Sequence, residues 1–217
     1  MIKRKVYTIG FLLLLLGIYW LCLLPILAIR TSLEPRQFFL AMLIWGVLCG
    51  IFFIPALAVI VKKVWFFEGK GEPVVQELLL SILATVNDHN APVTLKKHGK
   101  KLIFTWRYKD PAWCEYLEKS EMNRIYELWL RFDDHTKTVS MTDRYRSVNW
   151  DLSPISVTTG RFSFSRPFLR VEIGDQWGVE NYEDTEPKDY TYTPNEIKSP
   201  VMNSILKNGW NVRFNLF

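Results

Sequence analysis

The sequence contains few of the residues on which metal-binding and disulfide-bonded proteins depend. Its 217 residues include three cysteines and three histidines. Three cysteines cannot build a disulfide framework, and so low a number fits a reducing compartment. The histidines are far apart, each in a predicted turn, and none has the spacing of a zinc site. We therefore expect no metal centre, and no motif indicates a cofactor.

Catalytic motifs are also missing. The sequence has no G-x-S-x-G elbow, no P-loop and no G-x-G-x-x-G string. Cys114 has no base or orienting group near it in sequence, so we expect a small buried or half-buried side chain there. Asp133 and Asp134 lie in a predicted hairpin turn, where aspartate commonly bonds the backbone. The acidic segment from Gly174 to Asp189 lacks the ligand spacing of a calcium loop and is predicted to be a solvated loop.

Two stretches lack Asp, Glu, Lys, Arg and His altogether. Val6–Ile29 and Phe38–Val61 are each 24 residues long, and the eight residues Arg30–Gln37 separate them. At about 1.5 Å per residue, each makes a helix longer than the roughly 30 Å hydrocarbon core of a bilayer. The sequence thus predicts a transmembrane helical hairpin. Transporters usually carry an ionisable residue inside their spans, so transport is not expected.

The excess positive charge lies beside these spans. Residues 1–67 carry seven basic residues and one acid, a net charge of +6, whereas the other 150 residues carry 20 basic and 21 acidic residues. Lysine and arginine in short flanking segments favour the cytoplasmic side. We therefore expect both termini in the cytoplasm, and we do not interpret the basic pI as a nucleic-acid footprint.

The second span contains small residues at a helix-packing spacing. Gly46 and Gly50 form a GxxxG pair, which lets two backbones approach closely in lipid. This pair is predicted to pack either within the hairpin or between subunits.

A boundary between an anchor and a soluble domain is expected near residue 67. Lys62, Lys63 and the aromatic run Trp65–Phe67 are typical of a girdle at the headgroup level. Glu68–Glu72 contains two glycines and is predicted to be a short flexible linker. We therefore divide the chain into a two-helix anchor, 1–67, and a cytoplasmic domain, 68–217.

The domain shows alternation between apolar and polar residues, interrupted by turn signals. Hairpins are predicted over 93–108, with Gly99 in the turn, and over 126–145. Helices are predicted over 73–88, 110–119 and 199–208, and a closing strand over 210–217. Further short strands are predicted over 148–152, 161–165, 168–173 and 190–192.

These elements predict an α+β domain of mainly antiparallel strands, arranged as a sandwich or partly closed barrel, with one early and one late helix. A hairpin anchor followed by such a domain resembles membrane-tethered bacterial modules of pleckstrin-homology-like shape, which implies the bacterial inner membrane. The strand after the last helix departs from that pattern.

Basic residues interleaved with aromatic ones form the candidate binding site. They comprise five arginines within 27 residues and four lysines around a predicted turn: Arg144, Arg146, Arg161, Arg166, Arg170, Lys96, Lys97, Lys100 and Lys101. If neighbouring strands bring them together, they form a face for anionic headgroups, a phosphorylated ligand or a partner. The same alternation also fits the solvated face of an ordinary sheet.

The leading hypothesis is a non-enzymatic, membrane-anchored interaction or regulatory protein, whose cytoplasmic domain binds a protein partner or the anionic membrane surface. One alternative is a ligand-gated effector that binds a small anion and oligomerises through its membrane helices. A second alternative is a membrane-surface enzyme, for which the sequence offers only Cys114 and scattered acids.

Overall fold

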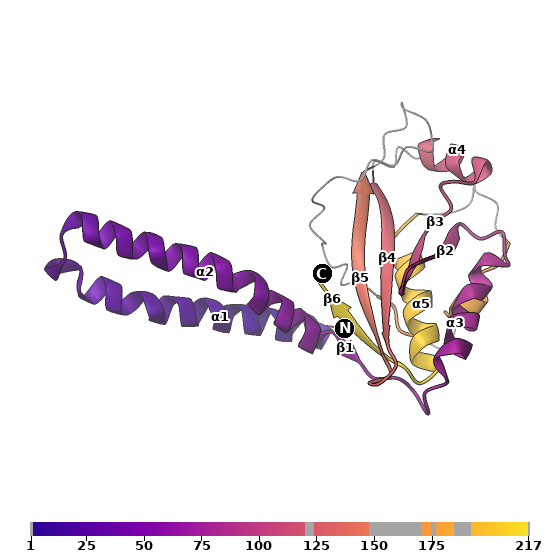
Figure 1. The fold of residues 1–217 in the computed structure, drawn as a ribbon, viewed down its shortest axis with the longest axis horizontal. Coiled ribbons are helices and arrows are strands. Elements are labelled where there is room, and N and C mark those ends of the chain that lie inside the picture. Colours follow the sequence, from indigo (N-terminus) through magenta and orange to yellow (C-terminus); the bar gives the residue numbers. More distant parts are fainter. Residues whose placement is uncertain (1, 120–123, 148–170, 175–176, 185–191, 217) are drawn as a thin grey trace. The chain divides into compact units, whose positions relative to one another are not determined.

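The computed structural model describes residues 2–119, 124–147, 171–174, 177–184 and 192–216 (Figure 1). The chain divides into two compact units, an N-terminal unit of Met1–Trp65 and a C-terminal unit of Phe66–Phe217.

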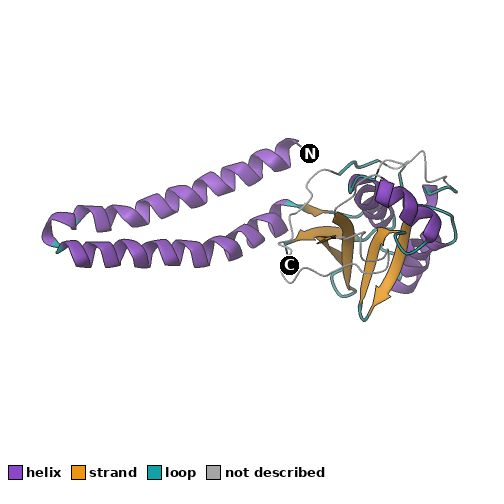
Figure 2. Ribbon diagram, turned by 90° about the horizontal axis from the view of Figure 1, so that it is seen from above, coloured by secondary structure: helices purple, strands orange, loops and turns teal. Residues whose placement is uncertain are grey.

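The N-terminal unit is a hairpin of two long apolar helices, as predicted. Helix α1 spans Ile2–Ala28, a 3-10 turn (η1) spans Arg30–Ser32, and α2 spans Pro35–Val64. Both helices are long and apolar enough to cross a membrane. The Arg4 guanidinium donates to the Val64 carbonyl at 2.6 Å, and Trp65 Nε1 donates to Thr8 Oγ1 at 3.1 Å. These bonds join the start of α1 to the end of α2, so the two helices run antiparallel (Figure 2).

Gly46 and Gly50 do not pack within this hairpin. A Cβ atom added at either position would meet nothing within 4 Å. The half-buried residues of α2, which include Met42, Trp45 and Cys49, lie on another face of the helix. Packing within the hairpin was therefore the wrong alternative for this glycine pair, and packing between subunits stays a prediction.

The described residues of the C-terminal unit form one mixed sheet of six strands. The strands are β1 (Phe66–Phe67), β2 (Val93–His98), β3 (Lys101–Trp106), β4 (Arg124–Asp133), β5 (Thr138–Ser147) and β6 (Asn211–Asn215). Their order is β1-β6-β5-β4-β3-β2. Among the described strands, only the β5–β6 pair is parallel.

Helices cover one face of this sheet. They are α3 (Gln76–Ala84), followed by a 3-10 turn (η2, Thr85–Asn87), and α5 (Asn195–Lys207), and they lie side by side (Figure 1). Alternate strand residues such as Phe104, Leu128 and Met141 point to this face and are fully or almost fully buried. We call it the core face, and the opposite face the polar face. Helix α4 (Pro111–Lys119) follows β3, and a 3-10 turn (η4, Val179–Asn181) precedes α5.

Both predicted hairpins are confirmed: β2 pairs with β3, and β4 pairs with β5. Their apolar and polar side chains alternate because one face of the sheet is apolar and the other is polar. The predicted helices are also present, although α3 ends at Ala84 and α5 begins at Asn195 instead of Ser199. The closing strand forms and runs parallel to β5, whereas the other described strand pairs are antiparallel, so the described sheet is mainly antiparallel, as predicted. A parallel pair needs a long crossover, and α5 is part of it.

The four further strands lie largely outside the described residues. Their described ends, 171–173 and Tyr192, are not in strands. The described strands form a single sheet, so the sandwich, the partly closed barrel and the pleckstrin-homology-like shape stay predictions.

The aromatic girdle and the flexible linker were misassigned at their junction. Phe66 and Phe67 form β1 at the edge of the sheet, where Phe67 is buried and its ring lies 5.4 Å from that of Phe214. The following residues are tied to the turn between α5 and β6. The Lys70 amide donates to the Leu206 carbonyl at 2.7 Å, and the Val74 amide donates to the Asn208 carbonyl at 3.1 Å. Glycine at this junction therefore permits close backbone packing and does not indicate flexibility.

Candidate functional site

The polar face of the sheet gathers basic side chains from five strands, β2 to β6. The register places Lys101, Arg131, Ser140 and Arg213 in one row across β3, β4, β5 and β6. Residues two positions along a strand share a face, so further basic residues join them. The described cations of this basic face are Lys96, Lys101, Arg131, Arg144, Arg146 and Arg213.

Trp129, in the middle of β4, is the centre of the basic face. The Arg144 guanidinium lies over its ring at 4.2 Å from the centroid, and Lys101 Nζ lies at 5.3 Å. The His98 ring meets it edge-on at 5.8 Å. Cations over an indole ring are attracted by its negative face, so Trp129 holds side chains of three strands together.

Glu127 partly offsets this positive charge. Its side chain is 4% exposed, and Arg146 Nε contacts its Oε1 at 2.6 Å. The Trp129 indole donates to Oε2 at 2.8 Å. Both carboxylate oxygens are thus engaged, and Glu127 orients two side chains of the basic face.

The structure unites some of the predicted basic residues and separates others. Lys96, Lys101, Arg144 and Arg146 share the polar face. Lys97 points to the core-face side and Lys100 lies in the β2–β3 turn. Arg161, Arg166 and Arg170 lie outside the described residues.

Sequence reasoning missed Arg131, Arg213, Trp129 and Glu127 as members of the basic face. The alternation of Glu127, Trp129 and Arg131 with leucines and Phe132 already placed them on one side of β4. Arg213 joins only because β6 pairs with β5, a contact between residues about 70 positions apart that no local pattern reports.

A separate groove lies between α3 and the β2–β3 hairpin, with a volume of about 570 Å³. Leu80, Leu95, Leu102 and Phe132 are among its apolar lining residues. The predicted binding residues Lys97, Lys100 and Lys101 also line it. Lys101 therefore borders both the groove and the basic face.

The core face holds a buried charged cluster that sequence reasoning did not find. Lys198 Nζ on α5 contacts Asp143 Oδ2 on β5 at 2.7 Å, and their side chains are 0% and 2% exposed. The Tyr126 hydroxyl donates to Asp143 Oδ1 at 2.5 Å. Burial, followed by the charge of Asp143, raises the pKa of Tyr126 well above its usual value, so Tyr126 stays a neutral donor. With no exposed atom on Lys198, the cluster joins α5 to the sheet and offers no surface to a ligand.

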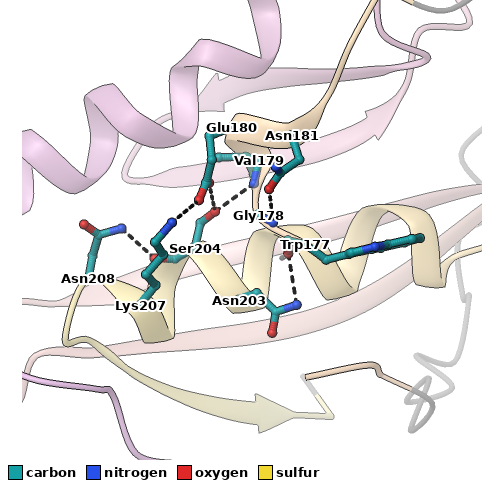
Figure 3. A network of polar contacts seen from close by, with 9 residues as sticks. All are labelled: Trp177, Gly178, Val179, Glu180, Asn181, Asn203, Ser204, Lys207 and Asn208. Carbon is teal, nitrogen blue, oxygen red and sulfur yellow. Dashed lines mark hydrogen bonds and ion pairs between the residues drawn. The ribbon is translucent and has the colours of Figure 1, made fainter. Parts of the chain in front are cut away.

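Side chains of α5 also bind the segment that precedes it, which we call the strap (residues 171–174 and 177–182; Figure 3). Ser204 Oγ accepts from the Val179 amide at 2.7 Å, and the Asn203 amide donates to the carbonyls of Glu172 and Trp177. Pro200 cannot donate to the Glu196 carbonyl one turn earlier. The Tyr182 hydroxyl donates to that carbonyl instead, at 2.5 Å.

Glu180 closes the strap on the last turn of α5. Its two carboxylate oxygens accept from Ser204 Oγ and from Lys207 Nζ, each at 2.8 Å. Burial alone would raise the pKa of Glu180, but the hydrogen bonds from Lys207, its own backbone and Ser204 outweigh burial and leave the pKa below the ordinary 4.5.

We expect Glu180→Gln to reduce protection of the strap amides at neutral pH. A carboxylate with a lowered folded pKa stabilises the fold above its ordinary pKa, and this contribution is lost as pH falls through the folded value. The difference between wild type and Glu180→Gln should therefore shrink from about pH 5 downward. Hydrogen exchange of 177–182 across pH 3–7 measures this difference, with Glu77→Gln, at an exposed position of α3, as a control. A pH-independent difference would contradict this assignment.

The remaining candidate residues, Cys114, Asp133 and Asp134, are buried or bonded within a turn. Cys114 is buried, as expected. Asp133, the last residue of β4, accepts from Thr136 Oγ1 at 2.8 Å, and Asp134 in the turn pairs with Lys137 at 2.5 Å, so both carboxylates bond within the β4–β5 turn. No group of three or more metal-ligating side chains occurs in the part of the chain that the structure describes.

Comparison with protein-family profiles, with curated protein sequences and with solved structures finds no match for this chain. The basic face therefore stands on its geometry alone.

Proposed function

We propose that this protein is a two-pass membrane protein with no enzymatic activity, whose C-terminal unit uses its basic face to bind an anionic partner. That partner is a protein or the anionic membrane surface. The observation that carries the proposal is that six cations share one face of the sheet and two of them, Lys101 and Arg144, lie over the Trp129 ring. Among the described residues, Glu127 is the one buried acid on that face.

Membrane insertion is supported by the N-terminal unit. Its two helices are long enough to span a bilayer, and no Asp, Glu, Lys, Arg or His lies within Val6–Ile29 or Phe38–Val61. Lys3 and Lys5 before the first span and Lys62 and Lys63 after the second favour cytoplasmic termini. The C-terminal unit would then face the anionic cytoplasmic leaflet, as in a bacterial inner membrane.

The basic face is tested by charge reversal. Lys101→Glu with Arg144→Glu should weaken binding to anionic vesicles by about thirtyfold or more, since each basic residue near such a surface contributes about 1 kcal/mol. The full chain in neutral-lipid nanodiscs is titrated with vesicles containing phosphatidylglycerol. Lys97→Glu with Lys100→Glu makes the same charge change off the basic face and serves as the control.

A parallel pull-down from a membrane extract tests for a protein partner. Loss of capture in the Lys101/Arg144 variant, but not in the control, supports the proposal. Equal effects of both double variants on vesicles and on capture, or the absence of any binding, would refute it.

The open face at Gly46 and Gly50 favours a second candidate, the ligand-gated effector. Nothing in the hairpin approaches these glycines, so a second copy could pack there. A strictly monomeric protein whose proteoliposomes never leak would exclude this function.

A further inference from the structure

The groove between α3 and the β2–β3 hairpin has walls that are tied together at one end. Asn87, in η2 directly after α3, bonds both backbone groups of Leu95 on β2. Its Oδ1 accepts from the Leu95 amide at 2.9 Å, and its Nδ2 donates to the Leu95 carbonyl at 3.1 Å. The carboxamide thus takes the place of a neighbouring strand, since β2 is the outermost described strand on this side of the sheet. The fold itself therefore holds the groove in shape.

The interior of the groove is apolar and only partly covered. The half-buried side chains of Leu80, Leu95 and Phe132 line it, from α3, β2 and β4. The Phe132 ring packs edge-on against Trp210, with the ring centroids 6.0 Å apart. Apolar surface that is still in contact with water gains free energy when an apolar group covers it. The groove volume of about 570 Å³ is within the range of small-molecule sites, about 300–1,000 Å³.

The charged residues of the described lining are all basic. They are Lys97 on β2, Lys100 in the β2–β3 turn and Lys101 at the start of β3. Lys101 Nζ lies over the Trp129 ring at 5.3 Å, so its charge belongs to the basic face. Lys97 and Lys100 are exposed, and Lys97 is on the core-face side of β2. Because β2 runs from Leu95 to this turn, positive charge lies at the turn end of the groove.

We propose that this groove binds an organic anion with an apolar tail, of the class of a medium-chain fatty carboxylate. The site is separate from the basic face and goes beyond the proposed function. The tail lies on Leu80, Leu95 and Phe132, and the carboxylate lies at the turn end, beside Lys97 and Lys100. Each buried methylene strengthens binding about fourfold, whereas an exposed ion pair contributes about fivefold at most. The tail therefore supplies most of the affinity, and the lysines select for the negative charge.

Titration calorimetry tests the site with hexanoate, octanoate and octanol as probes. The full chain is held in neutral-lipid nanodiscs, and empty nanodiscs provide the reference for partitioning into lipid. Octanoate should bind about tenfold more tightly than hexanoate, because it buries two more methylenes. It should also bind about fivefold more tightly than octanol, which has a tail of the same length and no charge.

Variants assign binding to the groove. Lys97→Gln with Lys100→Gln should weaken octanoate binding about fivefold and leave octanol binding unchanged, because it removes charge alone. Ala84→Phe adds a ring at an exposed position of the groove lining and should weaken binding of both probes about tenfold. Ser81→Phe adds the same ring at an exposed α3 position outside the lining and should change neither.

Three results would overturn the groove site. They are equal binding of octanoate and octanol, equal effects of Ala84→Phe and Ser81→Phe, and no binding above that of empty nanodiscs. Each would leave the proposed function standing, because the basic face is tested by vesicle binding and by Lys101→Glu with Arg144→Glu. Failure of that charge reversal would in turn leave the groove site standing.

Discussion

Asp143→Leu is expected to lower the free energy of unfolding of the C-terminal unit by about 3–5 kcal/mol, because it removes the carboxylate that pairs with the fully buried Lys198 ammonium. Lys198 also lies over the Phe214 ring at 3.8 Å, which cannot replace a carboxylate. Burial lowers the pKa of Lys198 although Asp143 opposes this, so removing Asp143 would lower the pKa further and favour loss of the proton or entry of water. Urea unfolding of the full chain in detergent micelles, followed by hydrogen exchange of the sheet, measures the loss.

The double variant Asp143→Leu with Lys198→Met is the decisive comparison. Replacing both members of a buried ion pair with apolar residues of similar size is often neutral or stabilising. The double variant should therefore recover most of the stability that Asp143→Leu loses, even though the Tyr126 hydroxyl loses its acceptor. If the double variant is as unstable as Asp143→Leu, the loss of stability does not come from the buried charge of Lys198, and the prediction is wrong.

Gly209→Ala is expected to cost about 2–5 kcal/mol, from two separate causes. The residue has φ +79°, a left-handed conformation that costs an L-residue about 1–2 kcal/mol. An added Cβ would also collide with the Glu72 carbonyl and the Pro73 nitrogen, and overpacking against backbone costs about 1–3 kcal/mol more.

Gly71→Ala is the matched control for that collision. Gly71 has the same φ of +79°, but an added Cβ there would meet nothing within 4 Å. Both variants share the left-handed strain and the smaller unfolded-state entropy of alanine, so their difference isolates the steric term. Urea unfolding of both in micelles provides it. Equal losses in the two variants would mean that the junction between residues 69–73 and the α5–β6 turn is not closely packed.

Local patterns predicted those parts of the fold in which neighbouring residues decide the structure. The absence of charge in Val6–Ile29 and Phe38–Val61 was enough to predict two long apolar helices, because the backbone hydrogen bonds of a helix form within one segment. The alternation of apolar and polar residues on both sides of Gly99 and of Asp134 was enough to predict two hairpins, because a short turn sets the register of the two strands.

The candidate site could be predicted only in part. Arg144 and Arg146 share a face because residues two apart on a strand must do so, and for the same reason Lys96 and Lys97 face opposite sides. Trp129 and Glu127 could have been included by the same rule. Arg213 and the Lys198–Asp143 pair could not, since they depend on α5 and β6 folding back onto β5.

The sequence by itself determined the apolar hairpin, the two β-hairpins and the two sides of each strand, because those follow from a segment's own length, charge and periodicity. The tertiary structure alone decided that β6 runs parallel to β5, that Phe66 and Phe67 join the sheet, and that glycines at the junction serve close packing. Each of these depends on a contact between distant segments. Such a contact is selected by the free energy of the whole packed unit and leaves no periodic signal in either segment.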